Sequence, residues 1–152
     1  MSWRDTALTV VALAALALPA YAAGPVVGPI MVSDPLATPQ PKGAATVLSM
    51  TVTNNGDVTD HLIRAACPDA ASVTFEAPAR EGSTELHQVE GFEVPARKAI
   101  FLKSGGWQIV LHDLRRTIAV SDVLPCTVTF QLSGEQIVQA GSKETIGLSD
   151  KD

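Results

Sequence analysis

The sequence predicts an all-β domain, a β-sandwich or a β-barrel, and three features of it support this. Beyond Gly28, apolar and polar residues alternate with a period of two, as they do in half-buried strands. No long segment repeats its apolar residues at the 3.6-residue period of a helix. Gly, Pro and Asn residues interrupt the alternating segments at short intervals, which is typical of all-β folds. A length of 152 residues suits a single domain.

The first 22 residues predict a secretory signal peptide rather than part of the domain. Arg4 contributes positive charge, Ala7 to Leu18 form an apolar run, and Ala20-Tyr21-Ala22 is a small-x-small cleavage site. The apolar run is shorter than the roughly 20 residues that cross a bilayer. We therefore expect cleavage after Ala22 and a mature chain without a membrane span, with an uncleaved signal anchor as the alternative.

The mature chain, taken in order, begins with a proline-rich region. Because proline cannot donate to a strand ladder, this region predicts a strand at the edge of a sheet followed by a loop; its prolines are at positions 25, 29, 35, 39 and 41. From Ala45 to Thr53, Leu48, Met50 and Val52 alternate with polar residues, and Asn54-Asn55-Gly56-Asp57 predicts a turn.

The same alternation continues to the end of the domain. It predicts further strands over residues 62–66, 72–76, 84–89, 99–103, 107–111, 126–132 and 136–140. Turn signals separate most of them, at 81–83, 104–106 and 133–135. Residues 141–152 are polar and without periodicity, so we expect a domain over 23–140 and a flexible tail after it.

Composition and charge exclude several classes of function. Removing the signal takes away Arg4 and Asp5, so the mature chain keeps the net charge of −5, without a cluster of basic residues. Such a surface argues against binding to nucleic acid or to anionic lipid. His112-Asp113 with Ser121 does not form a catalytic-triad signature, and no phosphate loop or paired-carboxylate motif is present. We expect that the protein is not an enzyme.

Cys67 and Cys126 are the two cysteines, and both lie in the mature chain. An even number of cysteines in an exported protein favours a disulfide, which here would close a loop of about 60 residues and stabilise the domain by roughly 4 kcal/mol. The alternative is a pair of unrelated buried thiols. Neither cysteine lies in a CxxC motif, which argues against redox catalysis.

Several strings of the mature chain, in order and spacing, resemble one family. They are Ile30-Met31-Val32-Ser33-Asp34, Ala37-Thr38-Pro39, Thr51-Val52-Thr53-Asn54-Asn55-Gly56-Asp57, Val89-Glu90-Gly91-Phe92-Glu93-Val94-Pro95-Ala96, Leu102-Lys103-Ser104-Gly105-Gly106 and Thr127-Val128-Thr129-Phe130. This pattern is similar to that of the PCuAC-type periplasmic copper chaperones, from about Ile30 to Ala140. The resemblance implies a cupredoxin-like Greek-key β-barrel and a role in delivering Cu(I), in particular toward the copper centre of cytochrome oxidase.

The resemblance also implies where copper ligands would lie, and this chain departs from the family there. The family binds Cu(I) with a His, a Met after ten intervening residues, and a His-x-Met after twenty-one more. Carried over, the closing His-x-Met falls on Gln108 and Val110, the first Met on Leu86, and the first His on Phe75, or on Glu76 if the loop is one residue shorter. None of these side chains is a good Cu(I) ligand, since Cu(I) favours thioether and imidazole donors.

Other residues are candidates for a substitute site. His112 lies two positions after Val110 and would share its face on a regular strand, while His87 and Glu76 lie near the other family positions. A site of His112, His87 and Glu76 would suit Cu(II) or Zn(II) better than Cu(I). The alternative is that each is an ordinary exposed polar residue, as we expect for His61.

Three further residues have core packing as their expected role. Met31 and Met50 fall in strand patterns, and Trp107 shares the parity of Ile109 and Leu111. For Trp107 the alternative is a position at the rim of a partner-binding patch.

The sequence therefore predicts an exported, periplasmic member of the copper chaperone family whose usual Cu(I) site has lost its ligands. Copper remains possible by resemblance, but no cofactor is required by these residues. The alternative is a metal-free interaction module that binds another envelope protein. In either case the expected partner is a cytochrome oxidase subunit or an assembly factor.

Overall fold

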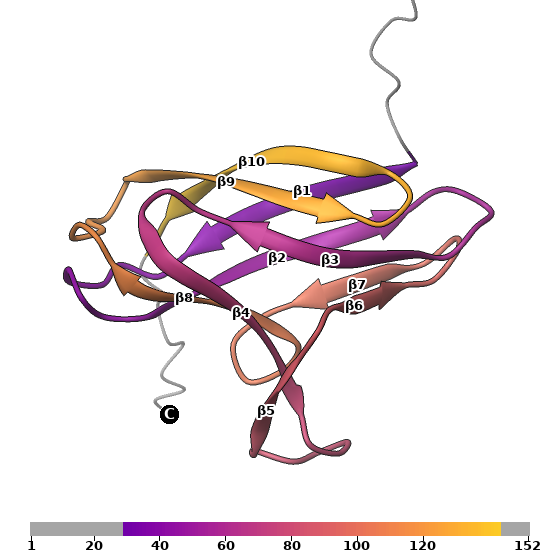
Figure 1. Ribbon diagram of the computed structural model, residues 1–152, viewed down its shortest axis with the longest axis horizontal. Coiled ribbons are helices and arrows are strands. Elements are labelled where there is room, and N and C mark those ends of the chain that lie inside the picture. The colour runs from indigo at the N-terminus through magenta and orange to yellow at the C-terminus, as the bar shows by residue number, and fades with distance from the viewer. Residues whose placement is uncertain (1–28, 144–152) are drawn as a thin grey trace, which may run out of the picture.

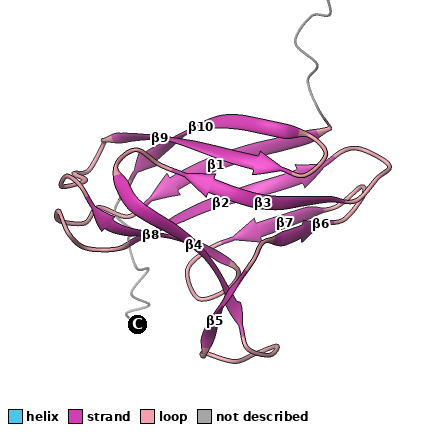
Figure 2. Ribbon diagram, in the orientation of Figure 1, coloured by secondary structure: helices cyan, strands magenta, loops and turns pink. Residues whose placement is uncertain are grey.

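The computed structural model describes residues 29–143, and all of its regular structure is β-strand (Figures 1 and 2). The strands are β1 (Ile30–Ala37), β2 (Thr46–Asn54), β3 (Asp60–Ala66), β4 (Ala70–Pro78), β5 (Leu86–Val89), β6 (Phe92–Val94), β7 (Ala99–Leu102), β8 (Gln108–Leu114), β9 (Val123–Phe130) and β10 (Gly134–Ser142). The expected signal peptide and most of the expected tail lie outside the described residues. Strand β10 continues two residues beyond the expected domain boundary at Ala140.

The strands form one sheet that rolls up into a nearly closed barrel (Figure 1). Their order is β5-β4-β8-β2-β1-β10-β9-β3-β6, and β7 pairs with the second half of β2. Strands β1 and β10 pair in parallel, and the other pairs are antiparallel. The predicted all-β class is confirmed.

The first strand is not at an edge, as the prolines led us to expect. Strand β1 lies between β2 and β10, in the middle of the sheet. Its register against β2 shifts between Ser33 and Leu36, and Asp34 has a φ of 51°. Such an irregularity takes Pro35 out of the regular ladder, so its missing N–H breaks no regular pair.

The core follows the predicted alternation. Its fully buried large side chains come from strands around the whole barrel and, for Ile118, from the segment between β8 and β9. They are Phe130, Leu48, Leu62, Leu102, Ile109, Leu111, Leu114, Ile118, Leu124, Val52, Val94 and Val128. Met50 belongs to this core, as expected. Met31 does not: it lies opposite Thr53 on the outer face and is 54% exposed, so its assignment to the core was wrong.

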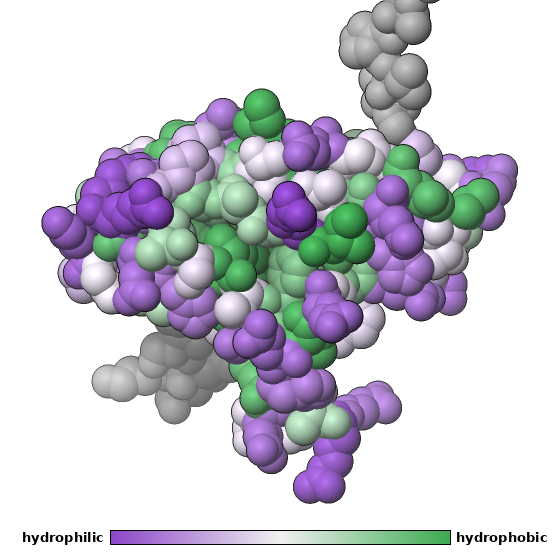
Figure 3. All heavy atoms as spheres, in the orientation of Figure 1, coloured by the Kyte–Doolittle hydropathy of each residue, from purple (hydrophilic) through white to green (hydrophobic). Residues whose placement is uncertain are grey.

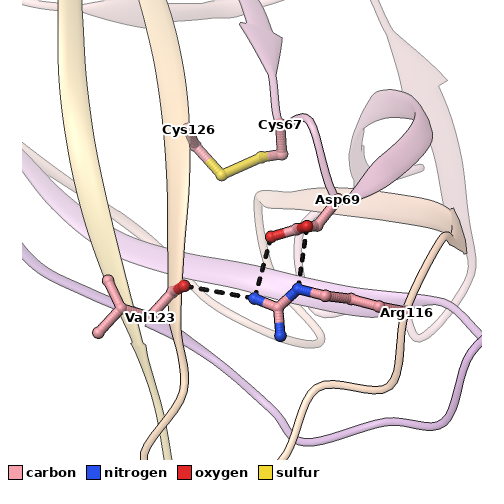
Figure 4. Close-up of a disulfide and its surroundings, with 5 residues drawn as sticks. All are labelled: Cys67, Asp69, Arg116, Val123 and Cys126. Atoms are coloured by element: carbon pink, nitrogen blue, oxygen red, sulfur yellow. Dashed lines mark hydrogen bonds and ion pairs between the residues drawn. A yellow bond between two sulfur atoms is a disulfide. The ribbon is translucent and has the colours of Figure 1, made fainter.

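Cys67 and Cys126 form the predicted disulfide, which is buried and ties the turn after β3 to β9 (Figure 4). The same turn is held a second time by an ion pair. Arg116 donates from Nε and Nη2 to the two carboxylate oxygens of Asp69, at 3.0 and 3.1 Å, and from Nη2 to the Val123 carbonyl oxygen at 3.4 Å (Figure 4). The turn between β3 and β4 is therefore fixed at both of its ends.

Gly91 lies against the backbone of β3, with no room for a side chain. A Cβ at this position would be 2.3 Å from the carbonyl oxygen of Leu62, a distance that requires the backbone to move. We expect Gly91→Ala to lower the free energy of unfolding by about 2–3 kcal/mol, measured by urea denaturation. Gly141→Ala is the matched control, because its Cβ would meet only Leu36 Cδ2 at 3.8 Å. Equal stability of the two variants would contradict the close approach.

Asp60 holds the turn between β9 and β10. Its buried carboxylate accepts hydrogen bonds from the His61 N–H at 2.8 Å, the Leu132 N–H at 2.9 Å, and the Ser133 N–H and Oγ at 3.0 and 2.6 Å. Burial alone would raise the pKa of Asp60, but the hydrogen bonds from Ser133, Leu132 and His61 outweigh it and lower the pKa below its ordinary value.

Because its pKa is lowered, Asp60 should make the free energy of unfolding depend on pH in acid. Because the folded-state pKa is below the unfolded one, Asp60 contributes stability above its unfolded pKa, and the contribution is lost as the pH falls through the folded pKa. In Asp60→Asn, the amide NH₂ would face N–H or O–H donors, which we expect to cost about 2 kcal/mol at neutral pH. Urea denaturation from pH 7 to pH 3 should show this deficit shrinking in acid. A deficit that is constant with pH would contradict the assignment.

Candidate functional site

Three strands, β4, β5 and β8, bring the expected ligand positions together on the outer face of the barrel. In antiparallel strands, residues directly opposite each other project to the same face. Glu76 lies opposite Gln108, Thr74 opposite Val110, and Pro78 opposite Leu86. Glu76, Leu86, Gln108 and Val110 therefore share one face.

Phe75, the other candidate for the first position, lies on the opposite face. It is opposite the buried Ile109, and its ring centroid is 5.3 Å from that of Phe92 in the core. Between the two alternatives from the sequence, it is Glu76 that lies beside Gln108.

A hydrogen bond joins the polar residues of this site. Gln108 donates from Nε2 to Glu76 Oε2 at 2.8 Å, and its Oε1 accepts from the Gly105 N–H at 3.0 Å. Gln108 is 6% exposed, so both ends of its buried amide are satisfied by the protein itself. Val110, also buried, lies opposite Val47 and offers no donor atom. The face is held by an amide–carboxylate pair and aliphatic packing.

A hollow of about 370 Å³ opens beside this pair. It lies between β2, β4 and β8 and two loops, and its lining residues are Thr38, Gln40, Ala45, Thr46, Val47, Ser49, Glu76, Ser104, Gln108 and Val110. Glu76 is the charged residue of this lining, and the other polar groups are hydroxyls and amides. As possible metal ligands, the hollow therefore offers oxygen and nitrogen atoms but no sulfur and no imidazole.

The structure does not bring the substitute ligands together. His112 lies on the same face as Gln108 and Val110, with its Nε2 2.7 Å from Thr74 Oγ1. It is four residues along β8 from Gln108, about 13 Å at the rise of a strand, and therefore far from Glu76. His87 lies opposite Ala77 on the other face and is exposed. Within residues 29–143, no three His, Cys, Asp or Glu side chains gather in a group that could hold a metal ion.

Two other sequence expectations are resolved near this site. Trp107 precedes β8 instead of belonging to it and is 42% exposed, so its assignment to the core was wrong. Its ring stacks on the buried Phe92 at a centroid distance of 5.4 Å. The Lys103 N–H bonds to the Trp107 carbonyl, which ends the Gly105-Gly106 turn and leaves Trp107 at its margin. His61 is a half-exposed residue 4.0 Å from Glu93.

Comparison with known proteins identifies the family. The sequence model of the LpqE-like family, described as "Putative lipoprotein LpqE-like", matches residues 30–141. The chain belongs to the LpqE-like family. No curated protein matches this LpqE-like chain in a sequence search.

Solved structures give the fold of this LpqE-like protein. The "Copper-bound PCuAC domain from PmoF2" superposes with a TM-score of 0.67 at 24% identity, over 77% of this chain and 94% of that one. Apo-DR1885 from Deinococcus radiodurans gives 0.62 at 26% identity, over 96% and 98%. Its Cu(I) form gives 0.63 at 25% identity, over 84% and 85%. The predicted cupredoxin-like, PCuAC-type barrel is confirmed.

None of the described residues of the LpqE-like protein forms a helix that could span a membrane.

Proposed function

We propose that this LpqE-like protein is an exported, metal-free binding module that serves assembly of the cytochrome oxidase copper centre. It does so without carrying Cu(I) at the position where the PCuAC-type copper chaperones carry it. One observation carries the proposal. Where the resemblance to the copper chaperones places His and Met, the outer face has the Glu76–Gln108 hydrogen bond with Leu86 and Val110 beside it.

The chemistry of these side chains supports the absence of Cu(I) binding there. Leu and Val have no donor atom, and the carboxylate and amide of Glu76 and Gln108 are hard oxygen and nitrogen groups that already bond each other. The soft donors of the domain lie elsewhere: Met50 is in the core and Met31 is on β1. Cys67 and Cys126 are joined to each other.

Export is supported by three features. The disulfide is of the kind that persists in oxidising compartments. The matching family is described as a lipoprotein family. Residues 1–22 have the three parts of a secretory signal. We propose the periplasm as the location, and an oxidase subunit or an assembly factor as the partner.

The role is tested by deleting the gene in its own organism and measuring the activity and copper content of cytochrome oxidase in the membrane. We expect both to fall, and added copper in the medium should not restore them, because the missing function is binding of a partner. Unchanged oxidase would contradict the pathway. Full rescue by copper would show that the protein supplies metal.

A control tests whether the outer face that carries Glu76 and Gln108 is needed for the function in the cell. Returning the gene with Glu76→Ala and Gln108→Ala together should restore oxidase if only the scaffold is needed, with the level of folded protein checked in parallel. Loss of complementation at a normal protein level would place the function in this face.

A further inference from the structure

A second feature of the barrel lies where the sheet does not close, and it shares strands β4 and β5 with the candidate site. Strands β3 and β4 leave the turn at Cys67 to Asp69 and diverge (Figure 1). Strand β6 pairs with β3 only over Asp60–Leu62, and β5 pairs with β4 only over Phe75–Pro78. Among the described residues, 63–66 of β3 and 70–74 of β4 therefore each have one edge without a strand partner. We call this opening the β3–β4 seam.

The floor of the seam is apolar and partly open to solvent. Ala65 lies opposite the buried Val128, Val73 opposite the buried Leu111, and Val89 opposite Phe75, so all three point inward. They pack against the core, yet each is only partly buried. The space-filling view shows apolar atoms in a hollow between β3 and β4 (Figure 3). An added strand needs an unpaired edge for its backbone hydrogen bonds and an apolar surface for its alternate side chains, and the seam has both.

Both ends of the seam are fixed. At the narrow end, the turn is held by the disulfide and by the Asp69–Arg116 pair (Figure 4). At the wide end, Phe75 of β4 contacts Phe92 of β6, and Phe92 stacks on Trp107. The two walls are thus joined by side chains at a place where no strand pairing joins them. A site fixed in this way loses little freedom when it binds.

The charges near the wide end indicate what kind of segment fits. Glu90 and Glu93 are exposed there, around a hollow of about 300 Å³ that Ile63 and Phe92 also line. His61 lies 4.0 Å from Glu93. Arg64, the basic residue of this edge, lies opposite Thr129 next to the register shift in β3 and is exposed. The two glutamates outnumber Arg64 at the wide end, so this end favours a cationic group on the occupant.

We propose that the β3–β4 seam binds an extended segment of a partner protein by strand addition. The segment would pair four or five residues with the free edges and place alternate apolar side chains over Ala65 and Val73. One further residue, a basic one, would extend toward Glu90 and Glu93. This goes beyond the proposed function and does not depend on whether the outer face binds copper.

The probe is the peptide acetyl-Lys-Val-Thr-Val-Thr-Val-amide, with a twin that is N-methylated at alternate amides. Binding to the full chain is measured with a fluorescein label, and hydrogen exchange locates the site. We expect the first peptide to slow exchange in 63–66 and 70–74, and the twin to bind about tenfold more weakly because it cannot complete the ladder. Equal binding of the two peptides would overturn strand addition.

Protein variants test the location. Ala65→Lys should weaken binding about tenfold by filling the seam, and Val73→Thr, which keeps the volume of the side chain, should weaken it less. Ile137→Lys is the control, because Ile137 is 75% exposed on β10, away from the seam. Indifference to both seam variants in folded protein would overturn the proposal. So would protection of the edges of β5 or β6, or protection that grows with protein concentration without peptide, which would assign the seam to a second copy.

Discussion

Replacing both cysteines, Cys67→Ala together with Cys126→Ala, is expected to lower the free energy of unfolding by about 4 kcal/mol and the melting temperature by about 15 °C. The two residues are 59 positions apart, so the bridge removes much of the freedom of the unfolded chain. Both sulfurs lie in the core, and each Ala also leaves unfilled volume. Within the described residues, this disulfide is the cross-link between the turn after β3 and strand β9.

Urea denaturation of the double variant, and of the parent with and without a phosphine reductant, measures this effect. The reduced parent should be destabilised nearly as much as the variant, and the variant itself should not respond to reductant. A loss below 1 kcal/mol would contradict a stabilising disulfide. Because the turn carries one end of the β3–β4 seam, hydrogen exchange at 63–66 should also increase in the variant.

Placing the four His and Met ligands of the PCuAC-type copper chaperones at the matching positions of this chain is expected to create Cu(I) binding. The variant is Glu76→His, Leu86→Met, Gln108→His and Val110→Met, and it places two imidazoles and two thioethers on one outer face of β4, β5 and β8. Leu→Met keeps its volume and Val→Met lies beside the existing hollow, so the barrel should tolerate the changes. Copper retained after desalting, measured by atomic absorption, should approach one ion per chain.

The matched control distinguishes the two alignments of the first position. A second variant with Phe75→His in place of Glu76→His, and the other three changes unchanged, puts that imidazole on the core face. It should retain much less copper and be less stable. Equal copper retention by the two variants would show that the register assigned to β4 does not decide the site.

The alternation of side chains was enough to predict most strands, because one face of each is buried and period two leaves little choice. It placed Met50 and Val52 in the core correctly. It failed for β1, where Pro35 argued for an edge, since a local irregularity that absorbs a proline has no sequence signature. It also missed β6, which at three residues is too short to show a period.

The site was predicted as a set of positions but not as a surface. Phe75 and Glu76 could not be told apart, because a loop that differs by one residue moves the whole strand to the other face. Only the pairing of Glu76 with Gln108 decides it. In the same way, His112 and His87 are close in sequence to the expected ligand positions but not close in space. His112 lies too far along β8 from Gln108, and His87 points to the opposite face of the sheet. The β3–β4 seam depends on which strands fail to pair, and that information is not local.

We propose that this LpqE-like protein does not hold Cu(I) at the positions where the copper chaperones of the resemblance hold it. A competition titration of the parent protein against a chromophoric Cu(I) chelator, with the disulfide intact so that Cys67 and Cys126 offer no thiolate, tests it most directly. We expect the protein to remove no copper from the chelator at micromolar affinity or tighter. A one-to-one Cu(I) complex tighter than micromolar would contradict it, and loss of that complex in His112→Ala would identify His112 as a ligand.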